Sequence, residues 1–264
     1  MGWTDAIRYV KGSAAKHGIE SLGNTPRVDD GLPLGARIGG ILKMQIAPFI
    51  RATTAGSLIR MPEDADTVIK AVGHVKLDFP GNIYRYYLSI GDNDAEKENF
   101  LQVVQDAQGI IVELMYCTRL TRIIPETEED QNAFTGEGGV GLGQRVYTLW
   151  REQIADSGYT EPELVAAMGD TESLDYVRET GSPNQEFVPP FAGEETRVDD
   201  AFGTHGLSQD IWFVPYVRQI GESKEYLLIT TEIVNSKDGD ASQRSIHVDF
   251  MIGIPLEVER VTIQ

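Results

Sequence analysis

Three acidic side chains at alternating positions could bind a hard divalent cation. Asp92, Asp94 and Glu96 place carboxylate oxygens in one short polar segment after an aromatic, strand-like run. Calcium and magnesium prefer oxygen ligands, but a complete calcium loop also has a central glycine and a glutamate at its twelfth position. This segment lacks both. We therefore favour a solvated hairpin tip, with a metal site at these three residues as the alternative.

A glycine-rich segment at 136–145 could expose backbone N–H groups to a phosphate. Such a cradle forms where glycines precede the N-terminus of a helix, and Gly139, Gly141 and Gly143 precede a predicted helix. The segment has neither a Gly-Lys-Ser/Thr ending nor Gly-x-Gly-x-x-Gly spacing, and no convincing strand precedes it. We favour a flexible surface loop, because glycine permits unusual backbone angles. Ligand binding at the three glycines is the alternative.

The sequence gives little support for a metal site, a disulfide or a nucleophilic serine built from its histidine, cysteine and serine residues. The histidines are His17, His74, His205 and His247. None has metal-ligand spacing to another, and Cys117 is the only cysteine, so a structural zinc site is disfavoured and an internal disulfide is impossible. His247 and Asp249 would share one face of a strand, which ordinary alternation explains. No Gly-x-Ser-x-Gly elbow is present. No cofactor is expected, and a non-enzymatic role is favoured.

The acidic composition limits the partners. With 41 acidic and 23 basic residues, the formal charge is −18. Such a surface repels nucleic acid and the anionic face of a membrane. Glu128, Glu129 and Asp130 lie in the densest acidic stretch and could attract a polyamine or a basic protein surface. The favoured interpretation is that the excess acid only maintains solubility.

The composition is typical of a globular protein, because 41% of the residues are hydrophobic. No secretory signal is recognised, and no stretch approaches the roughly 18 apolar residues of a membrane span. The expected location is therefore the cytoplasm, without direct membrane insertion.

Helices are expected to be few. Capping residues and periodicity predict helices at 4–17, 147–156 and 161–168. Residues 18–35 and 181–210 are rich in Gly, Pro and polar residues and are expected to be irregular connections.

Strands dominate the rest of the prediction. Residues 74–79 and 211–263 alternate between polar and apolar, and no helical crossover fits between neighbouring strands. Cys117 lies in an apolar strand-like run, which predicts a buried thiol. The sequence predicts an α+β fold, mostly antiparallel β as small barrels or a sandwich. The expected strands cover 36–50, 57–61, 67–79, 83–90, 100–104, 110–124, 211–220, 225–234, 245–254 and 257–263.

Composition divides the chain into four parts. Residues 1–31 are an N-terminal helix and linker, and 32–124 form a first β block. Residues 125–210 are an acidic insertion of loops and helices. Residues 211–264 form a C-terminal β block, which could share one domain with the first.

The segment Leu32–Gly40, with sequence LPLGARIGG, resembles the opening signature of the bacterial YjfK-like family, whose function is unknown. The glycines permit a tight turn and a bulge at the first strand, while Leu34 and Ile38 can enter the core. The resemblance extends over most of the chain from about Leu32 onward.

The resemblance implies an accessory role and supplies no catalytic residues. Members of the family are often encoded beside a phage-shock-type membrane-stress protein, small membrane proteins and an ATP-grasp ligase resembling glutathionylspermidine synthase. This neighbourhood implies an accessory or scaffold protein in an envelope-stress or polyamine-linked system. It would act through contacts with a basic or membrane-associated protein. The alternative is a carboxylate- or divalent-cation-dependent enzyme of unknown substrate.

Overall fold

The computed structural model describes five stretches of the chain, and the predicted helix at 4–17 lies outside them. These stretches are 27–62, 66–78, 80–89, 98–234 and 245–264.

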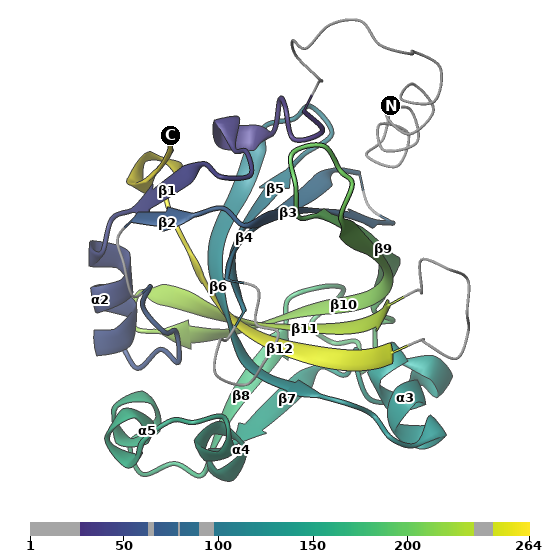
Figure 1. The fold of residues 1–264 in the computed structure, drawn as a ribbon. Helices are drawn as coiled ribbons and strands as arrows, with labels where there is room; N and C mark the ends of the chain where they lie inside the picture. Colours follow the sequence, from purple (N-terminus) through teal and green to yellow (C-terminus); the bar gives the residue numbers. More distant parts are fainter. Residues whose placement is uncertain (1–26, 63–65, 79, 90–97, 235–244) are drawn as a thin grey trace, which may run out of the picture.

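Antiparallel strands in this part of the chain close into an eight-stranded barrel (Figure 1). Around the ring the order is β3, β4, β5, β6, β12, β11, β10 and β9, which pairs with β3 again. Closure leaves the ring without a free sheet edge. The predicted α+β class with mostly antiparallel strands is confirmed. The strands are β3 (Ala71–Leu77), β4 (Asn82–Ser89), β5 (Asn99–Gln105), β6 (Ile111–Ile123), β9 (Phe191–Val198), β10 (Gly206–Ile220), β11 (Ser223–Val234) and β12 (Ser245–Pro255).

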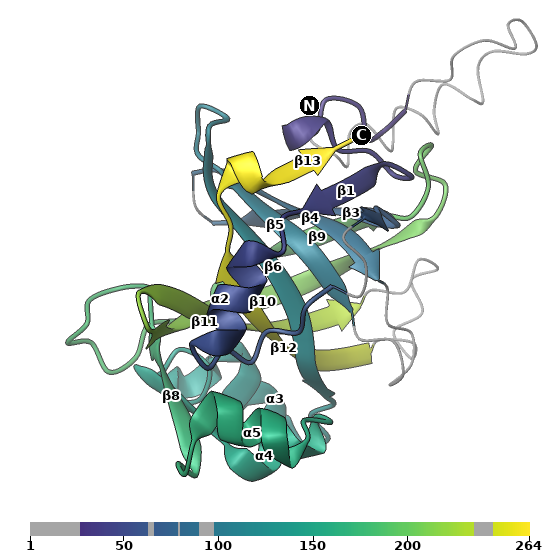
Figure 2. The same ribbon diagram turned by 90° about the vertical axis from the view of Figure 1, so that its left-hand side faces the viewer.

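Short elements cover the outside of the barrel. Figure 2 shows the small sheet β13-β1-β2 toward the end of the molecule opposite to α4 and α5. The hairpin of β7 and β8 extends the sheet beside β10. These elements are β1 (Ile41–Met44), α2 (Ala47–Thr54), β2 (Asp66–Val68), α3 (Glu128–Thr135), β7 (Val146–Trp150), α4 (Arg151–Asp156), α5 (Glu161–Met168), β8 (Ser173–Arg178) and β13 (Val261–Ile263), with 3-10 helices at Pro33–Gly35, Glu137–Gly139 and Val258–Arg260.

The two tyrosines of β4 show how alternation divides the barrel wall. Tyr86 points outward into the main core, where its hydroxyl donates to the Pro33 carbonyl at 2.8 Å. Tyr87 points inward and donates to Glu195 Oε1 at 2.6 Å. The outer face therefore packs against the covering elements, while the inner face fills the ring.

The interior contains an apolar cluster and a group of charged and polar side chains. Phe100, Met115, Phe213, Leu228 and Met251 belong to the apolar packing inside the ring. Charged side chains gather toward the end where β4, β6, β9 and β11 finish. We call this the polar end of the barrel. Its residues are Arg85, Glu98, Gln102, Arg122, Glu195, Arg197, Gln209, Thr230, Glu232, His247 and Asp249.

The motif Leu32–Gly40 forms a turn before β1. Gly35 and Gly39 both have positive φ, which glycine adopts without steric cost, so the predicted tight turn is confirmed. Leu34 and Ile38 are partly buried against the main core, as expected.

Several sequence expectations are wrong. Residues 181–210 are not an irregular connection, because they contain β9 and the start of β10. The inward residues of β9 are Gly193, Glu195 and Arg197. Because none of them is a large apolar residue, the sequence of β9 lacks the hydrophobic alternation that predicts a strand. A Cβ on Gly193 would lie 2.0 Å from the Lys76 carbonyl oxygen, so glycine lets the two strands approach closely.

Other predicted helices and strands have different boundaries in the structure. The helix predicted at 147–156 is half strand, because β7 runs to Trp150 and α4 starts at Arg151. The strand predicted at 36–50 covers only β1, and α2 then begins with a proline in its first turn. No strand forms at 57–61. The helix predicted at 161–168 is confirmed as α5.

Candidate functional site in the polar end of the barrel

The polar end is held together by a buried ion pair between β4 and β9, the two neighbours of β3. Glu195 on β9 accepts hydrogen bonds from Arg85 Nη1 at 2.9 Å, Tyr87 at 2.6 Å and Gln209 Nε2 at 3.1 Å. The same Arg85 nitrogen lies 3.9 Å from Glu232 Oε1 on β11. Burying charges is costly unless they are paired and hydrogen-bonded. Glu195 meets that condition, so its role is structural.

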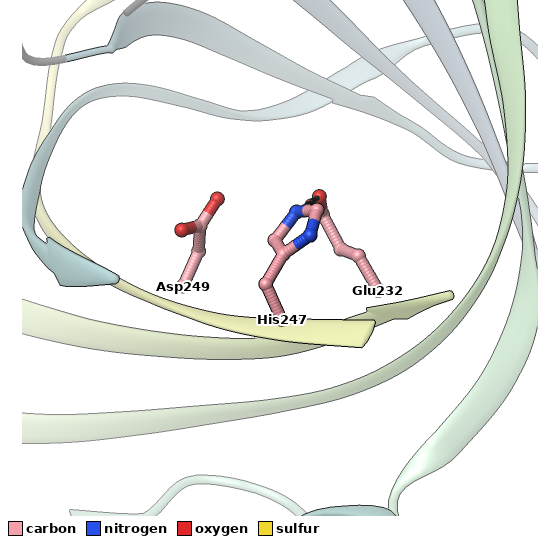
Figure 3. A group of neighbouring side chains, drawn as sticks. All are labelled: Glu232, His247 and Asp249. Carbon is pink, nitrogen blue, oxygen red and sulfur yellow. Dashed lines mark hydrogen bonds and ion pairs between the residues drawn. The ribbon is translucent and has the colours of Figure 1, made fainter. Parts of the chain in front are cut away.

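Beside this pair, four side chains form a square on two neighbouring strands. Thr230 and Glu232 lie two residues apart on β11, and their register partners on β12 are Asp249 and His247. All four face inward because residues two apart share a face of a strand. His247 Nε2 lies 2.7 Å from Glu232 Oε2. Figure 3 shows Glu232, His247 and Asp249 projecting together from this corner of the wall.

Three members of the square can supply metal ligands. One oxygen from Glu232, one from Asp249 and one ring nitrogen of His247 all lie within 4.8 Å of one another. Two carboxylates and an imidazole form a donor set that suits divalent transition metals.

Arg122 links the square to solvent. Its Nε and Nη2 each donate to Asp249 at 2.6 Å, in a bidentate pair that fixes the carboxylate. The Arg122 side chain is 34% exposed, whereas that of Asp249 is only 3% exposed. The partly exposed Arg122 side chain therefore connects the solvent with the buried Asp249 carboxylate.

The fourth member of the square, Thr230, has an unsatisfied hydroxyl. The residue is 1% exposed, and its Oγ1 has no hydrogen-bond partner among the described residues. A buried hydroxyl without a partner costs roughly 1–3 kcal/mol in mutational data. Such a group in a native structure calls for an explanation, and a bound ligand would supply one.

Glu98 adds a carboxyl with altered protonation at the start of β5. Burial and the neighbouring carboxylates of Asp249 and Glu232 raise the pKa of Glu98 to about 8, against the opposing effect of Arg122 and Arg197. A carboxyl of this kind is mostly protonated at neutral pH, so it can donate a hydrogen bond.

The pKa of Glu98 predicts a pH dependence of stability. Because the folded state binds this proton more tightly, its stabilising contribution is fully present below the ordinary pKa of 4.5 and is lost as pH rises through about 8. Within that window the free energy of unfolding should fall by up to about 1.4 kcal/mol per pH unit relative to Glu98→Gln. Urea unfolding of both proteins across this pH range measures the difference. Parallel pH profiles would contradict the assignment.

The residues proposed from the sequence that the structure describes are not members of the polar end of the barrel. Glu128, Glu129 and Asp130 form the exposed first turn of α3, where acidic groups stabilise the helix dipole. Thr127 Oγ1 caps this helix by accepting from the Asp130 backbone N–H at 3.1 Å. Binding of a cation at these acids stays a prediction. Asp92, Asp94 and Glu96 lie outside the described residues.

The glycine-rich segment uses part of its backbone internally. The Gly143 N–H donates to the Tyr216 hydroxyl at 3.0 Å, and the Gly139 N–H to the Gly136 carbonyl at 3.3 Å. A Cβ on Gly141 would lie 2.2 Å from the Ala133 carbonyl oxygen, so this glycine is needed for packing. Ligand binding by Gly139, Gly141 and Gly143 stays a prediction.

Sequence reasoning missed Thr230 and Glu232 and undervalued His247 and Asp249. The available signal was a pair of Thr-x-Glu and His-x-Asp patterns on consecutive predicted strands. Cys117 is buried, as predicted, and burial raises the pKa of its thiol well above the ordinary value. It is therefore unsuited to act as a nucleophile.

In the described part of the chain, no α-helix combines the length and apolar character needed to cross a membrane.

Comparison with known proteins finds a matching family for only part of the chain. Residues 13–117 match the model of a family described as "Protein of unknown function (DUF2491)". No curated protein and no solved structure matches the chain. The match covers the first three barrel strands, β3, β4 and β5, and part of β6, but it does not reach β11 or β12.

Proposed function

We propose that this chain is a binding protein that takes a small charged ligand into the polar end of its barrel. The observation that carries the proposal is the buried, unpartnered hydroxyl of Thr230 beside Glu232, His247 and Asp249. The other members of the square have partners, so they are ordered before a ligand arrives. Preorganised polar groups reduce the entropic cost of binding.

The chemistry of the interior favours a hydrophilic ligand over a lipid. The apolar side chains within the ring pack against one another, whereas the polar end combines carboxylates with arginines. An apolar molecule placed there would leave buried charges without solvation. A metal ion, a polyamine or a small dicarboxylate matches the side chains better.

An exposed apolar face supports the accessory role that the YjfK-like resemblance implies. Val146 and Val177 are register partners on β7 and β8, and Trp150 lies on the same face. All three are exposed. Aromatic residues are enriched at protein interfaces. In this proposal the barrel binds the ligand and the β7–β8 face contacts a partner protein.

The test of ligand binding compares Thr230→Val with Thr231→Val. Valine at 230 removes an unsatisfied hydroxyl, so the ligand-free variant should be as stable as the wild type or more stable. At 231 the hydroxyl donates to the Phe134 carbonyl at 2.5 Å on the outer face, so valine should cost about 1 kcal/mol.

Thermal unfolding is measured with zinc, manganese, spermidine and succinate. We expect at least one of these probes to raise the melting temperature of the wild type and of Thr231→Val, with a smaller rise for Thr230→Val. If no probe stabilises the protein, or if all three proteins respond equally, the polar end is not a ligand site.

A further inference from the structure

We propose that Glu232, His247 and Asp249 bind a divalent transition-metal ion, an assignment that rests on the proposed function and names its ligand. Imidazole and carboxylate together favour ions such as zinc, manganese or iron(II). Calcium and magnesium prefer all-oxygen coordination and gain little from a histidine.

The distances agree with this assignment. Metal bonds to nitrogen and oxygen are about 2.0–2.2 Å long, so neighbouring ligand atoms in a coordination sphere lie about 3–4 Å apart. The three candidate ligand atoms lie within 4.8 Å of one another. The hydrogen bond between His247 and Glu232, at 2.7 Å, would open slightly as the ion takes its place. Small side-chain rotations therefore suffice.

The surroundings provide the supporting contacts that metal ligands usually have. Arg122 holds the Asp249 carboxylate through two hydrogen bonds, and each oxygen keeps a further lone pair for an ion. The described residues supply three protein ligands here, so water would complete the coordination sphere, as in sites that keep an open position.

Thr230 is the independent observation that points to a ligand here. Its hydroxyl is buried and unpartnered, and the residue is directly opposite Asp249 in the register of β11 and β12. A water bound to the ion would give this hydroxyl the hydrogen bond that it lacks. The same water would explain why a polar residue occupies a position where valine would fit.

The experiment is calorimetric titration of the chelator-treated full chain with zinc, manganese, magnesium and calcium. We expect one equivalent of zinc or manganese to bind, with at least 100-fold weaker binding in His247→Ala and at least 10-fold weaker binding in Glu232→Gln. His205→Ala is the matched control, because the His205 side chain is 81% exposed and lies beside Asp200, which is not a member of the square. It should bind as the wild type does.

A second readout does not depend on the variants folding. Cobalt(II) added to the wild type should give a visible absorption band that zinc abolishes. Metal binding that is unchanged in both His247→Ala and Glu232→Gln would overturn the assignment, as would binding of magnesium or calcium alone.

The probes separate this inference from the proposed function. If no metal binds, but spermidine or succinate stabilises the wild type more than Thr230→Val, the metal assignment fails and the ligand site remains. If no probe binds, both fail.

Discussion

Glu195→Gln should destabilise the protein by about 3–5 kcal/mol, the range measured when one partner of a buried ion pair is removed. The Glu195 side chain is fully buried, and that of Arg85 is only 4% exposed. Glutamine keeps the shape but leaves the arginine charge without its nearest partner, because Glu232 is 3.9 Å away. Tyr87 and Gln209 would also lose a charged acceptor. Urea unfolding at pH 7 measures the loss.

The adjacent residue provides the control for this change. Glu194 lies on the outer face of β9, is exposed, and accepts a hydrogen bond from the Ser208 hydroxyl at 2.6 Å. Glu194→Gln should change stability by less than about 0.5 kcal/mol, as is usual for surface substitutions. Equal effects at 194 and 195 would mean that the inward and outward faces of β9 are assigned incorrectly.

Glu225→Gln should cause a loss of similar size, about 3–5 kcal/mol, on the outer face of the barrel. This fully buried carboxylate pairs with Arg218 Nε at 2.6 Å and accepts from the Tyr176 hydroxyl at 2.6 Å. It also accepts from the Leu58 backbone N–H at 2.6 Å and from the Ser57 hydroxyl. One carboxylate thus joins the segment after α2 to β8, β10 and β11.

Glu222→Gln is the control, because Glu222 is exposed in the turn between β10 and β11. Guanidinium unfolding should show no significant change for this variant. A cost below about 1 kcal/mol for Glu225→Gln would show that the four hydrogen bonds do not act on a charged acceptor.

Much of the β structure was predictable from the sequence because its pattern is local. The alternation in 74–79 and the β-branched and aromatic run at 83–90 match β3 and β4 closely. The helix at 161–168 was identified from a proline in its first turn and a glycine at its end. The sequence could not decide between barrel and sandwich, because closure depends on which distant strands pair.

The strand β9 was missed for a physical reason. Hydrophobic periodicity assumes an apolar interior, but this strand sends Glu195 and Arg197 inward to meet charges from other strands. A buried glutamate looks like a surface residue until its partner is located. Arg85, its partner, is 110 residues away in the sequence.

The candidate metal ligands could not be predicted as a group, because they meet only through the register of β11 and β12. A pairing shifted by two residues would place Thr230 opposite His247. In the structure Thr230 is opposite Asp249, and Glu232 is opposite His247. A shift of two residues keeps every side chain on its face but changes its neighbours. The alternation of His247 and Asp249 was visible in the sequence, whereas their meeting with Glu232 was not.

The most direct test of metal binding in the polar end is an anomalous difference map at the zinc edge. The crystals would contain the full chain with one equivalent of zinc. We expect the strongest peak inside the barrel, about 2.0–2.2 Å from the His247 imidazole and from the carboxylates of Glu232 and Asp249. Peaks found only at surface side chains such as His205, with none inside the ring, would contradict it.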